Sequence, residues 1–360
     1  MSFLNKNIIN LEPIFFGMDI NDAYVKVFQL EKDDKKDKIR SFACAVIKKG
    51  SIENGKIIKK EEVVFSIKEA LKKAGPKKIN TKKVICSLPE SKVFLRLINI
   101  PKMDEGEAYE AVKWEMEANI PLAIDCVYFD WQFIDSEVKN KQKVLTVAVH
   151  KEIVDTLLEV LEEAGLEPYV FEVESVATAR SLIPEDDQSE SLDLIVDLGK
   201  TRTSFIIVED GVPCFTSSIP FSSEVISDAI SKGLNINEAQ TEKIKNDYGL
   251  ENPLKNNPIP SSVKSVLENL AKELENTADF YSNSLQKAKS VDRIILSGTG
   301  ANLKGIIPYL IKRLRRDVEM GDPWINLRLG NDLPIINRED SIKFSTAIGL
   351  ALRGFYYYED

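Results

Sequence analysis

Cysteine and histidine are scarce in this chain. Its 360 residues include four cysteines and one histidine, and no two cysteines form a CxxC pair. The sequence therefore offers neither a cysteine-based zinc motif nor a dithiol redox motif. His150, the single histidine, follows the apolar run Val144–Val149. We expect it at the end of a strand rather than as the base of a catalytic triad.

Long apolar runs are also missing. No run approaches the roughly 20 apolar residues that a membrane-spanning helix needs. Residues 1–16 lack the charged start, apolar stretch and small-residue cleavage site of a signal peptide. We therefore expect a cytoplasmic protein. If it works at the inner face of the membrane, a partner must hold it there.

Acidic residues outnumber basic ones, 57 against 48, for a formal net charge of −9. The charge is uneven, because residues 1–83 carry 19 Lys and Arg against 11 Asp and Glu, a net +8. A net acidic chain argues against nucleic acid as a partner. The basic segment either faces an anionic membrane surface or forms an ordinary solvated face. Its last lysines are Lys72, Lys73, Lys77, Lys78, Lys82 and Lys83.

The sequence contains an internal echo. Residues 14–28 and 193–207 both begin with a mostly apolar run, turn on a polar cluster and resume an apolar pattern. The echo aligns Asp19 with Asp197. Each copy predicts a β-hairpin. Their repetition predicts an α/β protein made of two related lobes.

Residues 91–166, between the hairpins, predict a unit of their own. The expected strands are Val93–Ile100, Val127–Ile134 and Val144–Val149, and the expected helices are Asp104–Ile120 and Ile153–Ala164. This pattern fits a small α/β subdomain inserted into the first lobe. After the second hairpin we expect helices over Ser222–Ser231, Ile236–Tyr248 and Val263–Lys289, a strand over Ile294–Leu296 and a helix over Phe344–Arg353.

The turn of the second hairpin has the residues that a triphosphate needs. Gly199 permits close approach of the backbone to phosphate oxygens. Thr201 and Thr203 supply hydroxyl donors, and Lys200 can offset phosphate charge. Asp197 ends a buried strand, where its carboxylate can orient waters on Mg²⁺. We expect these side chains to form one wall of a nucleotide site.

A later bend is the second nucleotide-binding candidate. Residues 294–305 predict a strand, a glycine turn and the start of a helix. A base or ribose can rest against such a turn while the helix N-terminus faces an anion. The candidate residues are Gly298, Thr299, Gly300 and Leu303.

The first hairpin offers less to a phosphate. Asp19 can also hold Mg²⁺ through water. Asn21 and Asp22 follow it, however, where small residues are expected near phosphate. Asp22 would repel a triphosphate unless magnesium or a turned side chain relieves the repulsion.

The order of these loops resembles the actin/Hsp70/FtsA superfamily, and within it the chain is similar to the PilM family of type IV pilus assembly proteins. The inserted segment carries much of the likeness, in Leu97–Pro101, Ala111–Pro121 and Val127–Gln132. The connecting segments Glu172–Ala177 and Thr346–Arg353 match as well. The similarity extends over nearly the whole chain.

The resemblance implies an actin-like (ribonuclease H-like) two-lobed α/β fold with subdomains 1A, 1C, 2A and 2B. Subdomain 1A would comprise residues 1–90 and 167–188, with a helix over about 342–360 crossing back to it. Subdomain 1C would comprise 91–166, 2A would comprise 189–225 and 290–341, and 2B would comprise 226–289. ATP with Mg²⁺ would lie between the lobes, in contact with the loop residues named above.

The resemblance also implies a scaffold that has no catalytic residue and is at most a weak ATPase. The implied partners are the cytosolic N-terminal tail of a PilN-like membrane protein, held between 1A and 1C, and the PilO-type and pilus motor components; self-association is compatible with this reading. Alternatives of the same fold are a sugar- or acetate-kinase-like phosphotransferase, an actin-like filament former, and a type II secretion or FtsA-like relative.

The predicted helix Asp104–Ile120 has two apolar stripes. Tyr109, Val112, Met116 and Ile120 share one face at about 100° per residue. Ala111, Trp114 and Ala118 form a second stripe, nearly opposite. This second stripe either packs on 1A or borders a peptide groove. In the latter case Trp114 is the partner-binding anchor, as exposed aromatic residues often are.

Overall fold

The computed structural model describes residues 13–33, 36–120, 122–134, 141–185, 191–251, 259–284, 290–329 and 335–356. Some sequence predictions fall outside these ranges. They are the end of the predicted helix Val263–Lys289, at 285–289, and the end of the predicted crossing helix, at 357–360.

The first predicted hairpin is the centre of a six-stranded sheet, with the order β11-β7-β1-β2-β3-β6. β1 pairs antiparallel with β2 and parallel with β7. The strands are β1 (Phe16–Ile20), β2 (Tyr24–Asp33), β3 (Lys36–Val46), β6 (Gly75–Pro76), β7 (Lys83–Leu88) and β11 (Glu167–Val173).

Two helices cover one face of this sheet. The buried side chains of α1 (Lys60–Lys73) and α3 (Lys151–Glu163) pack in one apolar cluster with β1, β2 and β7. Leu157, Val160 and Leu161 of α3 belong to that cluster. α3 therefore packs with the first lobe, although the sequence analysis counted it in the inserted subdomain. A small hairpin, β4 (Ile52–Glu53) and β5 (Lys56–Ile57), precedes α1.

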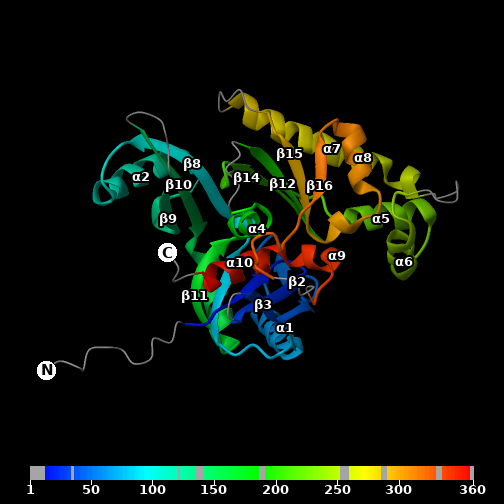
Figure 1. Cartoon of the computed structure of the whole chain (residues 1–360), viewed down its shortest axis with the longest axis horizontal. Helices are drawn as coiled ribbons and strands as arrows, with labels where there is room; N and C mark the ends of the chain where they lie inside the picture. Colours follow the sequence, from blue (N-terminus) through cyan, green and yellow to red (C-terminus); the bar gives the residue numbers. More distant parts are fainter. Residues whose placement is uncertain are drawn as a thin grey trace.

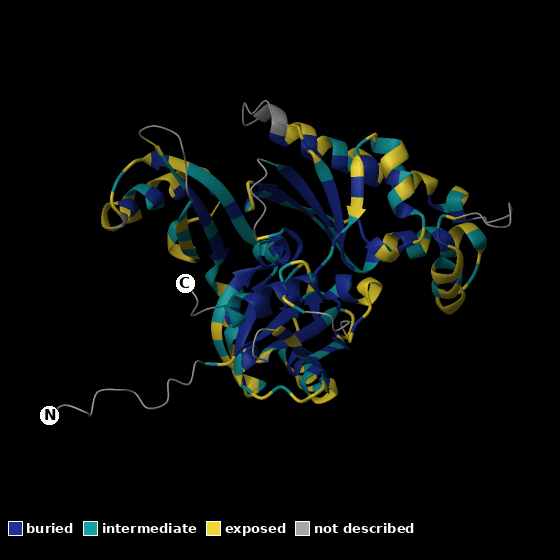
Figure 2. Ribbon diagram, viewed as in Figure 1, coloured by how far each residue is buried: buried dark blue, intermediate teal, exposed yellow. Residues whose placement is uncertain are grey.

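The inserted unit is a three-stranded antiparallel sheet with one helix on it. β8 (Val93–Pro101) and β9 (Val127–Ile134) flank β10 (Lys141–His150), which ends at His150 as expected. α2 (Glu105–Asn119) covers one face with Ala108, Val112 and Met116. Figures 1 and 2 show this unit as a separate arm whose helix has an exposed outer side.

The second apolar stripe of α2 does not pack on the first lobe. Trp114 is 73% exposed, and Ala118 is exposed beside it. The alternative in which this stripe packs on 1A is therefore wrong. The first stripe is largely buried as predicted, except that Tyr109 is 47% exposed; its ring is tilted against that of Phe129, with 5.6 Å between ring centroids.

The second lobe repeats the strand order of the first. The second sheet contains the order β14-β13-β12-β15-β16, which corresponds to β3-β2-β1-β7-β11 in the first sheet. The two aspartates also occupy equivalent ladder positions: Asp197 pairs with Ser204, and Asp19 pairs with Lys26. The internal echo is thus a structural repeat. The strands are β12 (Leu192–Leu198), β13 (Thr203–Glu209), β14 (Val212–Ile219), β15 (Arg293–Ser297) and β16 (Asp317–Met320). β14 also meets β8 at one residue pair, Phe215 with Arg96.

Helices cover the second sheet much as predicted. α5 (Ser223–Leu234) and α6 (Glu238–Tyr248) lie within about three residues of their expected bounds, and α7 (Ile259–Ser284) begins four residues before its expected start. The helix expected directly after the glycine turn begins later. A 3₁₀ turn at Thr299–Asn302 comes first, and α8 (Ile306–Leu314) follows Gly305, whose φ of +80° interrupts the helix.

Two helices cross between the lobes at the centre of the molecule (Figure 1). α4 (Glu174–Leu182) follows β11, and α10 (Ser345–Phe355) follows the short helix α9 (Arg338–Ser341). At Gly349 an added Cβ would lie 1.7 Å from the carbonyl oxygen of Ala177. The hydroxyls of Thr178 and Thr346 hydrogen-bond at 2.9 Å across the same contact. The crossing therefore requires glycine on α10.

Among the described residues, no helix combines the length and the apolar character needed to cross a membrane.

We predict that Gly349→Ala unfolds at markedly lower denaturant than the parent protein. The new methyl group must separate two buried backbones, which should cost more than about 3 kcal/mol of the free energy of unfolding. Gly106→Ala is the matched control, because nothing lies within 4 Å of its added Cβ on exposed α2. Urea titration should place that control within about 1 kcal/mol of the parent. Equal stability of the two variants would contradict the close crossing.

Candidate functional site

The turns of the two hairpins face each other across a cleft of about 680 Å³, open solvent at its mouth included. The first turn follows β1 and the second follows β12. The glycine turn after β15 and the first residues of α4 and α10 complete the walls. The lining residues include Asp19, Asn21, Asp22, Tyr24, Lys26, Glu90, Glu174, Asp197, Gly199, Lys200, Thr201, Arg202, Ser204, Ser218, Gly298, Thr299 and Thr346.

Most of the candidate nucleotide residues meet at this cleft. Seven line it: Asp19, Asp197, Gly199, Lys200, Thr201, Gly298 and Thr299. Three others lie behind the surface. Thr203 is fully buried, and its hydroxyl donates to the Phe221 carbonyl oxygen at 2.9 Å. Gly300 is buried, and Leu303 packs in the core of the second lobe.

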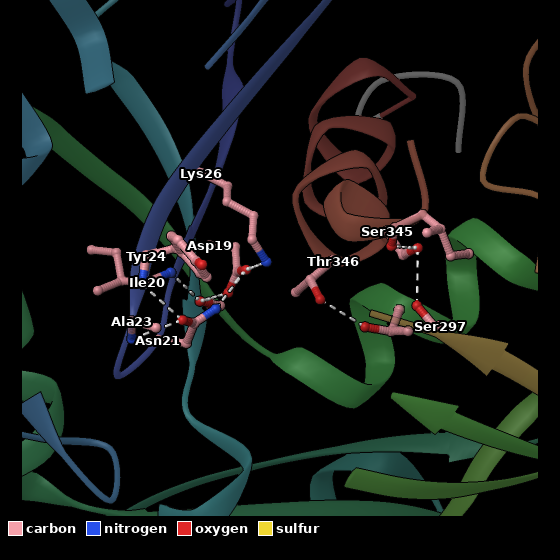
Figure 3. Close-up of polar contacts among 12 residues, drawn as sticks. Asp19, Ile20, Asn21, Ala23, Tyr24, Lys26, Ser297, Ser345 and Thr346 are labelled. Atoms are coloured by element: carbon pink, nitrogen blue, oxygen red, sulfur yellow. Dashed lines mark hydrogen bonds and ion pairs between the residues drawn. The ribbon is translucent and has the colours of Figure 1, made fainter. Parts of the chain in front are cut away.

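Asp19 is held by its own hairpin. Its carboxylate forms a buried ion pair with Lys26, with 2.9 Å between Oδ2 and Nζ. Asn21 Nδ2 donates to the same oxygen at 3.2 Å, and Ser87 Oγ donates to Oδ1 at 3.3 Å. Burial lowers the pKa of Lys26, but the carboxylates of Asp19 and Asp197 outweigh it and raise that pKa. Lys26 is therefore a buried, charged lysine in the cleft wall, and Figure 3 shows its ammonium turned toward Asp19.

The first turn satisfies its own backbone donors. Asn21 Oδ1 accepts from the amides of Ala23 and Tyr24 at 3.1 and 3.0 Å, and the Asn21 amide donates to the Tyr24 carbonyl oxygen. Figure 3 shows Asn21 turned back onto its hairpin. These amides cannot bind a phosphate without breaking the turn.

Asp22 is turned toward the β4–β5 hairpin. Its carboxylate oxygens accept from the amides of Asn54 and Gly55, both at 2.9 Å. Bonds to two backbone donors offset part of its negative charge. The turned side chain considered in the sequence analysis is therefore present, although Asp22 still borders the cleft.

Three further carboxyl groups line the same cleft, those of Asp197, Glu90 and Glu174. Burial raises the pKa of Asp197 to about 6, with smaller increases from Asp19 and Glu90 and an opposing effect of Lys26. Burial also raises the pKa of Glu90, and it raises that of Glu174 well above its ordinary value. Glu174 accepts from the Glu90 amide at 3.1 Å, and Glu90 accepts from the Ser175 amide at 3.3 Å. The cleft concentrates acid groups at the start of α4.

The second turn and the glycine turn fit an anionic ligand better. An added Cβ at Gly298 would lie 2.3 Å from Asp197 Oδ1, so only glycine allows this approach. Among the described residues, nothing hydrogen-bonds the buried hydroxyl of Thr299. Lys200 and Arg202 supply positive charge at the same wall. A phosphate-bearing ligand thus suits this side of the cleft. The first turn, whose amides are bonded to Asn21 and Tyr24, offers no comparable donors to a phosphate.

Lys200 also reaches across the cleft. Its ammonium lies 5.4 Å from the ring centroid of Tyr24 in the first lobe, within the range of a cation–π interaction.

In the described part of the chain, no group of three or more His, Cys, Asp or Glu side chains is arranged to hold a metal directly.

The sequence analysis missed Lys26, Glu90 and Glu174. Lys26 had a usable signal, because it stands seven positions after Asp19 in a tight hairpin and therefore pairs with it across the ladder. Glu90 and Glu174 had none, since they come from separate segments that only the fold brings to the cleft.

A second, larger hollow lies between the inserted sheet and the first lobe, with a volume of about 2710 Å³ that includes its open side. β9 and β10 form one wall, and β11, α4 and the end of α10 form the other. We call it the 1A–1C groove. Its apolar residues include Tyr128, Leu145, Val147, Val149, Val170, Phe171, Val173, Val176, Ile183 and Leu352.

One ion-pair cluster forms the floor of the 1A–1C groove. The side chain of Glu172 is only 4% exposed, and Arg180 binds it with both terminal nitrogens, at 2.5 and 2.8 Å. Arg353 of α10 contacts the same carboxylate. Burial raises the pKa of Glu172, but the two guanidinium groups outweigh it and lower that pKa. The floor thus carries two positive charges against one negative charge.

Trp114 does not line this groove. α2 packs on the face of the inserted sheet that bears Val127, Val144 and Ala148, whereas Tyr128, Leu145 and Val147 face the groove. Since successive strand residues point to opposite faces, Trp114 lies on the far side of the sheet from the groove.

A family model described as type IV pilus assembly protein PilM matches residues 17–355. Among solved structures, the chain is similar to a PilM–PilN type IV pilus biogenesis complex, with a TM-score of 0.79 and 26% identity over 95% of this chain and 99% of that one.

More distant structures share the fold. The ethanolamine utilization protein EutJ from Carboxydothermus hydrogenoformans has a TM-score of 0.57 and 15% identity, over 94% of this chain and 89% of that one. MreB5 of Spiroplasma citri bound to ADP has a TM-score of 0.51 and 13% identity, over 94% of this chain and 95% of that one.

The cell division protein FtsA of Bacillus subtilis (strain 168) is 23% identical in sequence over 265 residues, 67% of this chain and 59% of FtsA. The chain thus spans about three fifths of the FtsA sequence that it matches.

We predict that protonation of Asp197 adds to the stability of the folded protein as the pH falls from about 6 to 4. The folded-state pKa of Asp197, about 6, lies above its ordinary value of 3.8, so the folded state holds the proton more tightly than the unfolded state. The stabilisation is present at low pH and is lost as the pH rises through 6. Asp197→Asn should reduce this slope and raise the free energy of unfolding at pH 7 by about 1–2 kcal/mol.

Urea titrations at pH 4.5 and 7 would measure both effects. Asp340→Asn is the control, because a hydrogen bond from Lys343 lowers the pKa of that exposed carboxyl group. Removing the Asp340 carboxyl group should leave the change in the free energy of unfolding between pH 4 and 6 as it is in the parent. An unchanged slope in Asp197→Asn would contradict the assignment.

Proposed function

The chain belongs to the family of type IV pilus assembly proteins PilM, and from that premise we propose that it is a cytoplasmic, actin-like scaffold of a pilus assembly complex, whose 1A–1C groove holds the N-terminal tail of a PilN-like membrane protein. The family assignment rests on a match over residues 17–355. The partner is inferred from the similarity to a PilM–PilN complex over 95% of this chain.

The groove supports a peptide as the occupant. One wall is an inserted sheet face with Tyr128, Leu145 and Val147, and the other is the first lobe with Phe171 and Val176. Apolar walls of this kind suit the side chains of a short extended segment. The two arginines on the floor can receive carbonyl or carboxylate oxygens of such a segment.

We propose further that the cleft binds ATP with Mg²⁺, mainly through the second turn and the glycine turn. Gly298, Thr299, Lys200 and Arg202 offer the approach, the hydroxyl and the positive charge that phosphates need. Asp197 would orient magnesium-bound water. The ligand would act as a signal between the lobes rather than as a substrate. PilO-type and motor components would join through the PilN-like partner, which would also hold the protein at the inner membrane face.

We predict that Val147→Asp weakens binding of a synthetic PilN-like tail by more than tenfold. Val147 lies on the groove face of β10 and is half-buried, so the new carboxylate would be desolvated by the bound peptide. Isothermal titration calorimetry measures the affinity, and thermal unfolding checks the fold. Trp114→Ala, on the other side of the same sheet, should bind the tail as the parent does. Equal affinity of parent and Val147→Asp would remove the groove as the binding site.

We predict that Asn21→Gly raises the affinity for ATP·Mg²⁺ several-fold. The substitution removes the side-chain oxygen that caps the amides of Ala23 and Tyr24, and it thereby frees two donors for phosphate. Calorimetric titration with ATP·Mg²⁺ is the measurement, and Lys200→Ala should weaken binding in both backgrounds. Repeating the titration with the tail present tests coupling, which must be reciprocal if nucleotide changes tail affinity. Unchanged affinity in Asn21→Gly would show that the first turn does not limit binding.

A further inference from the structure

The segment that joins α1 to β7 is rich in lysine. Between Glu69 and Glu90 the chain has six lysines and no acidic residue. All of these lysines except Lys83 are exposed. We call the five exposed ones the lysine face: Lys72, Lys73, Lys77, Lys78 and Lys82.

The fold brings these lysines to one edge of the first sheet. Lys72 and Lys73 end α1, and Lys78 Nζ donates to the Lys72 carbonyl oxygen, which holds the following loop against the end of the helix. Farther along this loop, the Lys82 carbonyl oxygen accepts from the Glu167 amide at 2.9 Å. Figure 1 shows α1 and this loop at the end of the first lobe that is turned away from the second lobe.

The lysine face and the cleft lie at opposite edges of that sheet. β1 and β7 run parallel, and Asp19 stands near the carboxyl end of β1, whereas β7 begins at Lys83. A contact made through the face therefore leaves the cleft accessible. The 1A–1C groove also stays open because, like the cleft, it has none of these lysines among its described lining residues.

Few carboxylates offset the charge of the lysine face. Glu31 gives one oxygen to Arg40 and the other to Lys77, at 2.7 and 2.5 Å, so Arg40 alone balances its charge. Glu69 lies 3.9 and 4.0 Å from the two lysines that end α1. The exposed carboxylates that bound the face on the β11 side are Glu162, Glu163 and Glu167. The face between these two acidic positions is therefore strongly positive.

The residue types of the face suit a lipid surface better than a nucleic acid. Lysine is a point charge on a flexible stem, whereas a fixed phosphate is usually held by the planar fork of arginine. No aromatic residue lies between Phe65 and Phe94, so this segment offers no ring on which a base could stack. Residues 84–360 carry 29 Lys and Arg against 46 Asp and Glu, a net −17, which would repel a long polyanion that reached past the face.

We propose that the lysine face binds the anionic lipid headgroups of the inner membrane surface. An anionic plane attracts the end of the molecule that carries the net +8 of residues 1–83 and repels the acidic remainder. The membrane would therefore orient the protein, with the second lobe turned away from the lipid. The inference rests on the proposed function in one respect, since a PilN-like partner brings the chain to the membrane.

The contact is weak when it acts alone. Attraction between a few lysines and a charged leaflet is screened beyond about 10 Å at 0.1 M salt. A bound tail in the 1A–1C groove would hold the lysine face close to the membrane and so raise its effective concentration there. The two attachments together would bind more tightly than either one.

Vesicle co-sedimentation of the full chain tests the proposal. At low salt the parent should bind vesicles of phosphatidylcholine that contain about one third phosphatidylglycerol, should not bind vesicles of phosphatidylcholine alone, and should be released by high salt. The triple variant Lys73→Gln, Lys78→Gln and Lys82→Gln should lower the partition coefficient at least about tenfold, because each lysine contributes separately to the attraction.

A second triple variant removes the same charge from the second lobe. Lys232→Gln, Lys243→Gln and Lys264→Gln change exposed lysines on α5, α6 and α7, and this protein should bind the anionic vesicles as the parent does. Urea titration checks that both variants are folded. The proposal is overturned if the two variants lose binding equally, if the first loses none, or if the parent does not prefer anionic vesicles.

Other anions provide the remaining comparisons. Inorganic phosphate at matched ionic strength should not release the protein from the vesicles; release would mean that the face holds a free anion. If the first triple variant loses binding to single-stranded DNA but keeps vesicle binding, the face serves a nucleic acid. Either result refutes the proposal. Titration with the synthetic tail, without vesicles, tests the proposed function separately, and a parent that binds vesicles but no tail would refute that function alone.

Discussion

The close crossing of α4 and α10 is the constraint on which the rest of the molecule depends. Gly349 brings the backbone of α10 against the Ala177 carbonyl group, and Thr178 and Thr346 hydrogen-bond across the contact. Gly17 lets β1 approach the same helix, since an added Cβ would lie 2.3 Å from the Ala347 carbonyl oxygen. α4 packs on the second sheet and α10 packs on the first. Their separation sets the width of the cleft above them, and the groove takes its wall from the same two helices.

The cleft contains more buried carboxyl groups than positive charges to balance them. Lys26 lines the cleft together with Asp19, Asp197, Glu90 and Glu174, and burial raises the pKa of the last three. Such a cluster is unfavourable without compensating charge or protonation. A ligand that brings only negative charge would worsen it, whereas one that brings magnesium would relieve it. The self-capping of Asn21 and the turned Asp22 allow the first hairpin to keep its shape without phosphate.

Much of the fold could be predicted because its signals are local. The hairpins around Asp19 and Asp197 follow from apolar runs and polar turns, and they proved to be the centres of two repeated sheets. The start of α8 and the packing of α3 were harder to predict. A positive φ at Gly305 delays α8. The apolar face of α3 packs against the lobe before it in the sequence, because a helix buries its face against whichever sheet the chain returns to.

The amino-acid sequence by itself determined where strands, turns and helices form, the echo of the two lobes, and the candidate phosphate residues of the second turn. Those properties depend on side chains within a few positions of one another. Only the tertiary structure decided that Glu90 and Glu174 join Lys26 in the cleft, that Leu303 and Thr203 lie behind it, and that Trp114 faces away from the groove. Burial and charge proximity between distant segments depend on how layers stack, and a linear pattern of residue types leaves that stacking open.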